Sequence, residues 1–371
     1  MSHHSKIGKS FDVHVPKTHS GHKHHKADKK ADPGKAPKKL GAKDSFDANA
    51  DASNVDLGAG ASSGRRPLPR NWKTNPAVLQ AANPKDLYCV GDVHGDYKSL
   101  LNLLNKEGLI KGIPASPAQV QWTGGAATLV CTGDIIDKWK DSTDAIQLFR
   151  SLQASAGAAG GRVIVTMGNH EAEFLADPTN KKAAPFVAEL QKLGVNPQDV
   201  ATGRDSLGIG AWMRGLPIGA KVGDWFFAHA GNTGGRTMAQ LESDIEKGVD
   251  HDGFASKVLM GANSPVESTL GDGSWWTSKA SAADNMKALG VTHLVEGHQP
   301  GKVTLSDGTV RQSDQLLRDE LKGGRQFWLI DAGMSAGADK TGGEMLHVHE
   351  DGRSEIDTVI DAQGNIKRVD G

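Results

Sequence analysis

The chain has 371 residues, of which 37% are hydrophobic, with two Cys and a formal net charge of −1. This near-neutral total hides a division, because residues 1–70 hold 14 Lys and Arg against seven Asp and carry +7, which leaves −8 on residues 71–371. We find no secretory signal and no run of about 18 apolar residues, and two Cys are too few for a disulfide-stapled secreted scaffold. We therefore expect a cytoplasmic protein without a membrane span.

The first 70 residues have the composition of a disordered segment. They run through Lys, His, Ala, Pro, Gly, Ser and Asp without a sustained apolar period, and all eight Trp and both Tyr lie after them. A segment with so little to bury cannot offset the entropy lost on ordering. We predict a disordered, basic, His- and Lys-rich arm at 1–70 and one folded domain at 71–371. The charge of the arm would allow weak contact with nucleic acid or an anionic surface.

Short apolar runs alternate with amphipathic segments along the predicted domain. Short apolar runs of this kind are typical of buried strands. The predicted strands are residues 86–90, 127–131, 162–167, 225–229, 293–295 and 326–331.

Helical patterns separate the first three of these strands. A stripe of Leu at 100–104 predicts one helix, and the Asp, Ser and Thr of 141–144 could cap the first turn of another. Strands separated by helices indicate a largely parallel sheet covered on both faces. Residues 344–350 and 354–360 instead alternate around Asp351-Gly352, which indicates an antiparallel hairpin.

The residues that directly follow five of the predicted strands are rich in metal-binding types. In open α/β sheets, ligands bind where strands end. The segments are Gly91-Asp92-Val93-His94-Gly95-Asp96, Gly133-Asp134-Ile135-Ile136-Asp137, Gly168-Asn169-His170-Glu171, His229-Ala230-Gly231 and Gly297-His298-Gln299-Pro300. Each places Asp, Asn or His beside a Gly, which permits a tight turn and keeps bulk away from the side chains. One such segment is usually a solvated loop, but five in order predict a metal site.

The chemistry of these side chains favours particular metals. Oxygen ligands from Asp and Asn combined with imidazole nitrogen suit Mn, Fe or Zn better than calcium. Six candidate ligands exceed the needs of one ion, and two ions about 3.5 to 4 Å apart can bind the attacking and leaving oxygens of an in-line phosphoryl displacement. A hydroxide held between the ions is the natural nucleophile. The leaving alkoxide then needs a proton donor on the other side, and His170 is well placed to be it.

The order of the five segments resembles the calcineurin-like metallophosphoesterases and, within them, the phosphoprotein-phosphatase clan. The likeness covers roughly residues 85–350. Four more features are similar to the bacterial-type, Shewanella-like Ser/Thr phosphatases: Trp122-Thr123-Gly124-Gly125, Ala159-Gly160-Gly161-Arg162, Leu216-Pro217 and Asp331-Ala332-Gly333. The resemblance implies an α/β fold, namely a metallophosphoesterase-type β-sandwich of mixed sheets flanked by helices.

The resemblance also implies roles for individual residues. The implied ligands are Asp92 and His94 for the first metal, Asp134 as the bridge, and Asn169, His229 and His298 for the second. His170 becomes the general acid and Asp137 the carboxylate that orients its ring. Asn169 is implied in substrate binding as well.

Three positions depart from the family's protein phosphatases. Those enzymes usually have Arg after the second Asp of GDxxD, where this chain has Lys138, and many have further Arg where it has Met167 and Thr277. An Arg fork holds a phosphate through two parallel hydrogen bonds, whereas Lys is a point charge. We therefore predict that Lys138 binds substrate within a looser clamp. The candidate replacements for the missing Arg side chains are Arg214, Arg236 and Lys279.

The leading functional hypothesis is a dinuclear metal phosphomonoesterase that resembles Ser/Thr protein phosphatases and acts on a phosphoprotein or a small phosphoester. A second hypothesis is a hydrolase of small phosphoesters or dinucleoside polyphosphates, favoured if Trp139, Trp275 and Trp276 line the cleft. A third is a catalytically inactive scaffold recruited through the arm. The presence of all six predicted ligands and of His170 weighs against the third.

Overall fold

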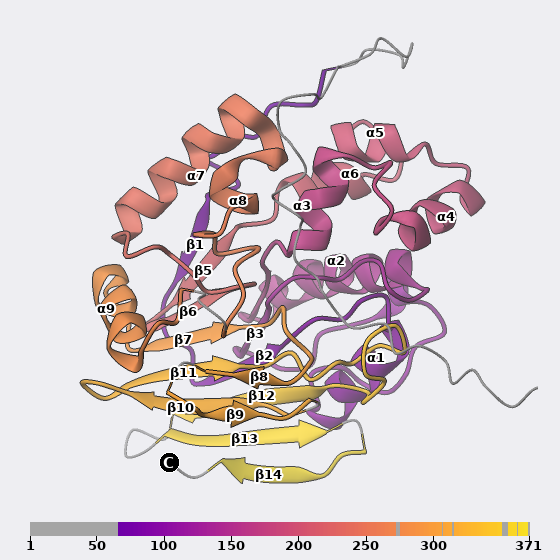
Figure 1. Ribbon diagram of the computed structural model, residues 1–371. Coiled ribbons are helices and arrows are strands. Elements are labelled where there is room, and N and C mark those ends of the chain that lie inside the picture. Colours follow the sequence, from indigo (N-terminus) through magenta and orange to yellow (C-terminus); the bar gives the residue numbers. More distant parts are fainter. Residues whose placement is uncertain are drawn as a thin grey trace, which may run out of the picture. The chain divides into compact units, whose positions relative to one another are not determined.

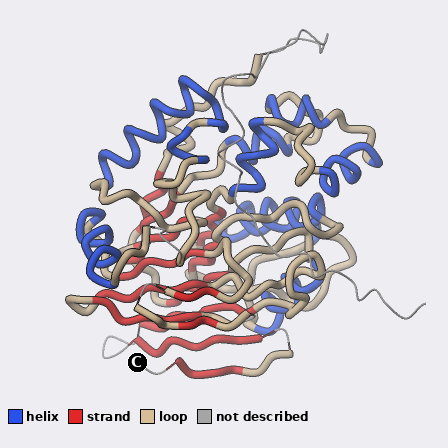
Figure 2. Tube along the Cα trace, in the orientation of Figure 1, coloured by secondary structure: helices blue, strands red, loops and turns tan. Residues whose placement is uncertain are grey.

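The computed structural model describes residues 66–271, 275–305, 307–313, 315–350, 355–361 and 363–369. All of them belong to the unit that spans residues 43–371. They form two six-stranded sheets and a two-stranded ribbon, with helices around them (Figures 1 and 2). Residues 1–65 of the predicted arm and the predicted turn at Asp351-Gly352 lie outside the described residues.

The first sheet is mixed. Its strands lie in the order β1 (Val78–Ala81), β5 (Gly219–Val222), β6 (Trp225–Ala228), β7 (His293–Glu296), β11 (Arg325–Leu329) and β10 (Leu317–Leu321). The three strands β6, β7 and β11 run parallel to one another, and so do β1 and β5. The pairs β5–β6 and β10–β11 are antiparallel.

The second sheet is mixed as well. Its order is β14 (Ile366–Val369), β13 (Glu355–Asp361), β12 (Glu344–Glu350), β2 (Asp86–Val90), β3 (Thr128–Cys131) and β4 (Arg162–Val165). The strands β2, β3 and β4 are parallel, and β12 and β13 form the predicted antiparallel hairpin. Strand β12 also pairs antiparallel with β2, so β2 lies inside the sheet.

The two sheets pack face to face. Leu87, Cys89 and Val130 of the second sheet share one buried cluster with Phe227 and Trp328 of the first. The other face of each sheet packs on helices, as α2 does on β4 and α9 on β10 (Figure 1). The predicted α/β sandwich of mixed sheets is confirmed.

Helices and short ribbons connect the strands. The helices are α1 (Tyr97–Lys106), η1 (Pro117–Gln119), α2 (Ser142–Ala158), α3 (Asn169–Ala176), α4 (Ala184–Lys192), α5 (Pro197–Thr202), α6 (Ile209–Arg214), α7 (Met238–Asp252), η2 (Gly253–Ala255), α8 (Lys257–Met260) and α9 (Lys279–Leu289). The ribbon pairs β8 (Val303–Thr304) with β9 (Val310–Arg311). In the described part of the chain, no helix has both the length and the apolar character needed to cross a membrane.

All six predicted strands are present, but one inference from them is wrong. A single, largely parallel sheet does not form, because the strands divide between two sheets that each have antiparallel neighbours. Strands such as β3 and β7 are buried at all four residues. A strand that is apolar on both faces gives the same pattern whether a helix or a second sheet covers it, so the pattern could not separate the two cases.

The start of α2 also differs from the expectation. Asp141 adopts a left-handed backbone and its side chain does not cap the helix. Instead the Glu189 carboxylate of α4 accepts hydrogen bonds from the backbone N–H groups of Ser142 and Thr143 at 3.1 and 2.9 Å. The cap comes from a distant helix, which local sequence cannot indicate.

Residues 66–70, which the sequence assigns to the arm, contact the folded domain. The backbone N–H of Leu68 donates to the carbonyl of Thr202 at 3.0 Å. The guanidinium of Arg70 donates to the carbonyls of Arg214 and Leu216, both at 2.8 Å, and lies over the ring of Trp72. Burial, with the nearby Arg214 charge, lowers the pKa of Arg70 to about 10.

A buried arginine holds together the loops that follow β7 and β11. Arg311 is 2% exposed. Its Nη1 donates to the carbonyls of Gln299, Pro300 and Gly301 at 2.6 to 2.7 Å, and its Nη2 donates to the carbonyl of Asp331. A planar guanidinium can serve several carbonyls at once, whereas the smaller ammonium of Lys cannot.

We expect Arg311→Lys to lower the free energy of unfolding by about 2–4 kcal/mol, because several buried carbonyls lose their donors. Chemical denaturation monitored by intrinsic Trp fluorescence measures this change. Arg162→Lys is the matched control, since Arg162 is exposed at the start of β4. Equal stability of the two variants would contradict the bracing role of Arg311.

Candidate metal centre

The five predicted segments meet where the two sheets adjoin. Three of them follow the neighbouring strands β2, β3 and β4, and two follow the neighbours β6 and β7. The ring of His229 from the first sheet lies with its Nδ1 2.9 Å from the carbonyl of Thr132 in the second. The backbone N–H of His298 donates to Asp92 Oδ2 at 2.9 Å. Side chains from both sheets therefore share one buried space.

The carboxylate of Asp134 lies at the centre of this space. Its Oδ2 is 3.3 Å from His229 Nε2, 3.5 Å from His94 Nε2 and 4.0 Å from His170 Nε2. Its Oδ1 accepts a hydrogen bond from the backbone N–H of His170 at 3.0 Å. Three rings from three separate segments of the chain thus face one carboxylate oxygen.

Backbone carbonyls orient the imidazoles. His94 Nδ1 lies 3.0 Å from the carbonyl of Ile136, as His229 Nδ1 does from that of Thr132. If each Nδ1 carries the proton, Nε2 is left unprotonated toward Asp134, which is the form that binds a metal. Burial, and then the charge of Lys138, lower the pKa of His94 well below its usual range, which favours this neutral ring.

Asn169 and His298 complete the other side of the centre. Asn169 Oδ1 lies 3.0 Å from His229 Nε2, and His298 Nδ1 lies 3.1 Å from the same nitrogen. The amide of Asn169 is oriented because its Nδ2 donates to Glu173 Oε1, which in turn accepts from Lys182. The oxygen of Asn169 therefore points into the centre.

These residues fit a pair of metal ions. His94, Asp134 and His170 form one group with ligand atoms within 4.8 Å of one another, and Asp92, Asp134 and His229 form a second, so Asp134 belongs to both. All are at most 2% exposed. Asp92 Oδ1 and His94 Nε2 are buried without a hydrogen-bond partner among the described residues. Buried polar atoms without partners are unfavourable, and metal ions would satisfy them.

The carboxylates have opposite electrostatic environments. Burial raises the pKa of Asp92 well above its usual range, and the carboxylates of Asp331 and Asp134 add to this rise. Burial alone would also raise the pKa of Asp134, but the imidazoles of His229 and His170 outweigh it and hold that pKa well below its usual range. Asp134 is thus the carboxylate around which the imidazoles of the centre gather.

Two glycines let the strand ends approach these carboxylates. A Cβ at Gly168 would lie 2.0 Å from Asp134 Oδ1, and one at Gly297 would lie 2.1 Å from Asp92 Oδ1. Both distances are far below van der Waals contact, so only Gly fits. This agrees with the expectation that Gly keeps bulk away from the ligands.

The backbone of the centre is strained. Among the described non-Gly residues, seven have positive φ, and five of these are predicted site residues: His94, Asp134, Asp137, Lys138 and His298. Left-handed conformations are unfavourable for residues with a Cβ and cluster at functional sites.

Sequence reasoning gave no role to Glu171, which is fully buried. Its carboxylate accepts backbone N–H groups of Gly168, Asp134 and Ile135 at 2.7 to 2.9 Å. Burial, with the neighbouring Asp134, raises the pKa of Glu171 to about 7, and the hydrogen bonds from Gly168 and Ile135 oppose that rise. The sequence signal that could have identified Glu171 is its position directly after Asn169 and His170, two candidate site residues.

Asp331 was also missed as a site residue. It follows β11 and its carboxyl pairs with that of Asp92, while the Lys138 charge lowers the pKa of both against the effect of burial. Its position directly after an apolar run and near Gly333 is the same signal that identified the other segments. Lys138 is thereby placed beside the centre.

His170 and Asp137 form a close pair. His170 Nδ1 lies 3.0 Å from Asp137 Oδ2, and His170 Nε2 faces Asp134. His170 Nε2 is buried without a hydrogen-bond partner among the described residues. The contact with Asp137 therefore orients the ring through Nδ1, and Nε2 is left without a hydrogen bond among the described residues.

The structure does not bring Arg214 into this group. Its guanidinium donates to the carbonyls of Ala201 and Leu68 at 3.1 and 2.7 Å and lies over the ring of Phe254. None of these partners is a predicted ligand, and the donors of Arg214 serve the packing of α5 and α6. Burial lowers its pKa.

The other two candidate cations pair with carboxylates away from the predicted ligands, and two of the tryptophans differ in exposure. Arg236 pairs with Asp244 at 2.9 Å, and Lys279 pairs with Asp319. Trp276 is 1% exposed and packs on Phe327, so it belongs to the core and does not line a cleft. Trp139 is 37% exposed.

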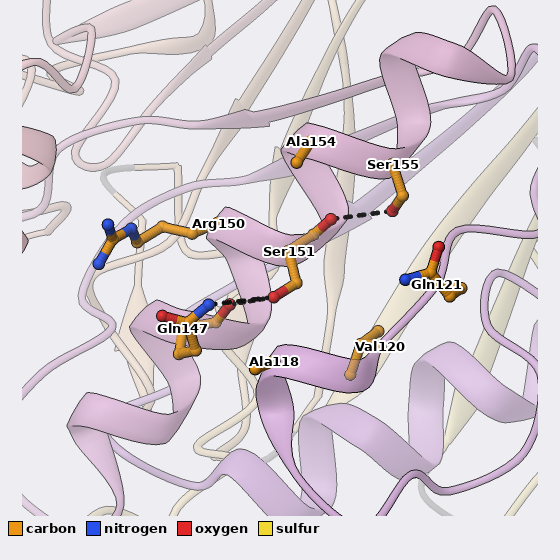
Figure 3. A pocket seen from close by; sticks show the side chains of 8 residues that line it. All are labelled: Ala118, Val120, Gln121, Gln147, Arg150, Ser151, Ala154 and Ser155. Carbon is orange, nitrogen blue, oxygen red and sulfur yellow. Dashed lines mark hydrogen bonds between the residues drawn. The ribbon is translucent and has the colours of Figure 1, made fainter.

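A hollow of about 480 Å³ lies elsewhere, between η1 and α2 (Figure 3). Its wall is polar, and Ser151 accepts from Gln147 Nε2 at 3.2 Å. The lining residues are Ala118, Val120, Gln121, Gln147, Arg150, Ser151, Ala154 and Ser155. None of them is a predicted ligand, so this hollow is separate from the metal centre.

The chain matches known proteins over the segments that build the centre. The model of the calcineurin-like phosphoesterase family matches residues 86–302. Shewanella-like protein phosphatase 2 of Arabidopsis thaliana is 29% identical over 106 residues, 28% of this chain and 26% of that protein. The symmetrical bis(5'-nucleosyl)-tetraphosphatase of Escherichia coli is 34% identical over 89 residues, 24% of this chain and 25% of that protein.

The chain thus spans only about a quarter of the length of these curated relatives. The fold match is wider. The solved structure of a cold-active protein-tyrosine phosphatase from a psychrophilic Shewanella species superposes on this chain with a TM-score of 0.60 at 19% identity. The superposition covers 82% of this chain and 87% of the phosphatase chain. The family match spans more than half of the chain and includes all five segments. The chain therefore belongs to the calcineurin-like phosphoesterase family.

Proposed function

We propose that this protein is a dinuclear metal-dependent phosphatase that hydrolyses a phosphoester of a protein or a small molecule. The observation that carries the proposal is the Asp134 carboxylate, which is shared by two buried groups of metal-type side chains. A shared carboxylate between two ligand groups is the arrangement that two-metal phosphoester hydrolases require. When bound, two such ions would activate water and neutralise charge on the phosphoryl oxygens.

The ligands divide between the two ions as the family resemblance implies. Asp92 and His94 would hold one, Asn169, His229 and His298 the other, and Asp134 both. The distances support placing Asn169 and His298 with His229. The assignment of Asp92 to the same ion as His94 rests on the resemblance, because Asp92 Oδ1 lies 4.0 Å from His229 Nδ1 and forms a group with His229 and Asp134. The donor set of oxygen and imidazole suits Mn, Fe or Zn.

His170 is the proposed proton donor to the leaving oxygen. The contact between its Nδ1 and Asp137 supports a ring that is held in one orientation with Nε2 toward the substrate. Burial raises the pKa of Asp137 to about 6, while the hydrogen bond from His170 opposes that rise. Above that pH Asp137 is mostly ionised, and its carboxylate can accept a hydrogen bond from His170 Nδ1.

Lys138 is the proposed phosphate-binding cation, assisted by Asn169. Its effects on the pKa of Asp92 and Asp331 support a position beside the centre. A single ammonium holds a phosphoryl group less rigidly than the Arg forks of many related phosphatases, so we propose broad and modest activity.

A second candidate function is hydrolysis of dinucleoside polyphosphates. It is favoured by the match to the tetraphosphatase of Escherichia coli and by the exposed Trp139, which follows Lys138 and could stack on a nucleobase. The burial of Trp276 removes one of the three aromatic side chains on which this alternative was based.

We expect Asp134→Asn to lose most bound metal and activity, because the bridging charge is removed. Elemental analysis of purified protein and a phosphatase assay measure both effects. Asp141→Asn is the matched control: Asp141 has φ 77° and Asp134 has φ 50°, so both substitutions test the same change on a left-handed backbone. Full metal occupancy with normal turnover in Asp134→Asn would refute the shared-carboxylate assignment.

His170→Asn should keep its metal but turn over alkyl phosphates about a hundredfold or more slowly, with a smaller loss on activated aryl phosphates. Poor leaving groups need a proton, whereas good ones do not. Kinetics on both substrate types, with metal content measured in parallel, test this. Equal losses would show that His170 is not the acid, and loss of one ion would make it a ligand instead.

Substrate preference tests the role of Lys138. We expect Lys138→Arg to be tolerated or to raise kcat/KM on aryl phosphates and phosphopeptides, since a fork replaces a point charge. Lys140→Arg is the control two residues away. Rates on phosphoseryl and phosphotyrosyl peptides, an aryl phosphate and diadenosine tetraphosphate should be compared. Strong preference of the unaltered protein for phosphoseryl peptides would refute the loose clamp, and a dominant rate on the dinucleotide would favour the second candidate.

A further inference from the structure

A separate group of metal-type side chains lies at the far end of β2. Asp86 is the first residue of β2, and Asp92 of the metal centre lies two residues beyond its last residue, so the six-residue separation corresponds to about 20 Å along an extended chain. His347 and His349 are on the adjacent strand β12, where His349 is paired with Asp86 and His347 with Tyr88. These four side chains form one patch on the sheet.

This patch is on the helix-covered face of the second sheet. Leu87, Leu346 and Val348 belong to the cluster between the two sheets. Because side chains alternate along a strand, Asp86, His347 and His349 point to the opposite face.

The ligand atoms converge on one oxygen. Asp86 Oδ1 lies 3.3 Å from His347 Nε2 and 3.6 Å from His349 Nδ1. One ligand atom from each of the three residues lies within 4.8 Å of the others. Ligands bound tetrahedrally at about 2.0 to 2.1 Å from zinc are about 3.3 Å apart, so the two measured separations need little change to accept an ion.

A second carboxylate fixes the ring of His347. Glu107, the residue after α1, has its Oε2 3.5 Å from His347 Nδ1. Tyr88 stacks on a face of the same ring, with centroids 3.8 Å apart. A carboxylate behind Nδ1 favours the tautomer in which Nε2 is unprotonated, and such pairs commonly support metal-binding histidines.

The charges also suit a divalent cation. Asp86 and Glu107 together carry two negative charges, which an ion of charge +2 balances, while both imidazoles are neutral ligands. Two imidazoles with one carboxylate suit zinc and similar transition metals, and are unlike the all-oxygen sites of calcium and magnesium.

We propose that Asp86, His347 and His349 bind one divalent transition-metal ion of the zinc type, with Glu107 as the residue that positions His347. The ion would join β12 to β2 and to the end of α1. Solvent would complete its coordination, since the side chain of His349 is 38% exposed. This site is independent of the proposed phosphatase activity.

The test is a zinc count on the full-length protein. Samples of the unaltered protein, His349→Ala and His251→Ala are equilibrated with Zn²⁺ against a chromophoric chelator that removes weakly bound zinc. His251 is the matched control because its side chain is 84% exposed on α7 and far from this patch in the fold. We expect His349→Ala to hold one zinc ion fewer than the unaltered protein and His251→Ala to hold the same number.

Asp86→Asn provides a second variant that preserves the side-chain shape, and it should also hold one ion fewer. Glu107→Gln should keep the ion at saturation but bind it about 10- to 100-fold more weakly, as expected for a residue that supports a ligand. Equal zinc content in His349→Ala and the unaltered protein, or the same loss in His251→Ala, would overturn the site. Unchanged zinc affinity in Glu107→Gln would overturn the positioning role of Glu107.

Discussion

The Glu171 carboxylate is the interaction on which the metal centre depends. It has no exposed surface, and it accepts backbone N–H groups from the loops after both β3 and β4. A charge-assisted acceptor of this kind fixes the two strand ends relative to each other. Asp134 belongs to one of these ends, and Asn169 and His170 belong to the other. The geometry of three functional side chains therefore rests on one carboxylate that accepts hydrogen bonds from backbone N–H groups.

The strained backbone around the centre is stable because of the frame that surrounds it. Positive φ at residues such as His94 and His298 is unfavourable by roughly 1 kcal/mol or more at each position. The apolar cluster between the sheets and the hydrogen bonds of Arg311 oppose relaxation of these loops. Functional groups are thus held in place by structure outside the centre, as preorganised sites require.

The sequence predicted local features well and tertiary ones less well. The apolar runs placed all six strands, and the polar residues after them include Asp92, His94, His170 and His229, which lie around Asp134. Periodicity could not separate a strand covered by a helix from one covered by a sheet, so the division into two sheets required the family resemblance. The cap of α2 by Glu189 and the location of Arg214 depend on contacts between distant segments, which no local pattern encodes. Asp331 carried the right signal and was overlooked.

The position of β2 inside its sheet has a consequence for the order in which the protein is built. Its neighbour on one side is β3, but its neighbour on the other is β12, so Asp86 and His347 are in contact across 261 residues of sequence. Closing so long a loop is slow relative to local pairing. Until residues 344–350 arrive, the strand that leads to Asp92 has one open edge. A nascent chain therefore keeps this edge exposed over the 261 residues that lead from Asp86 to His347.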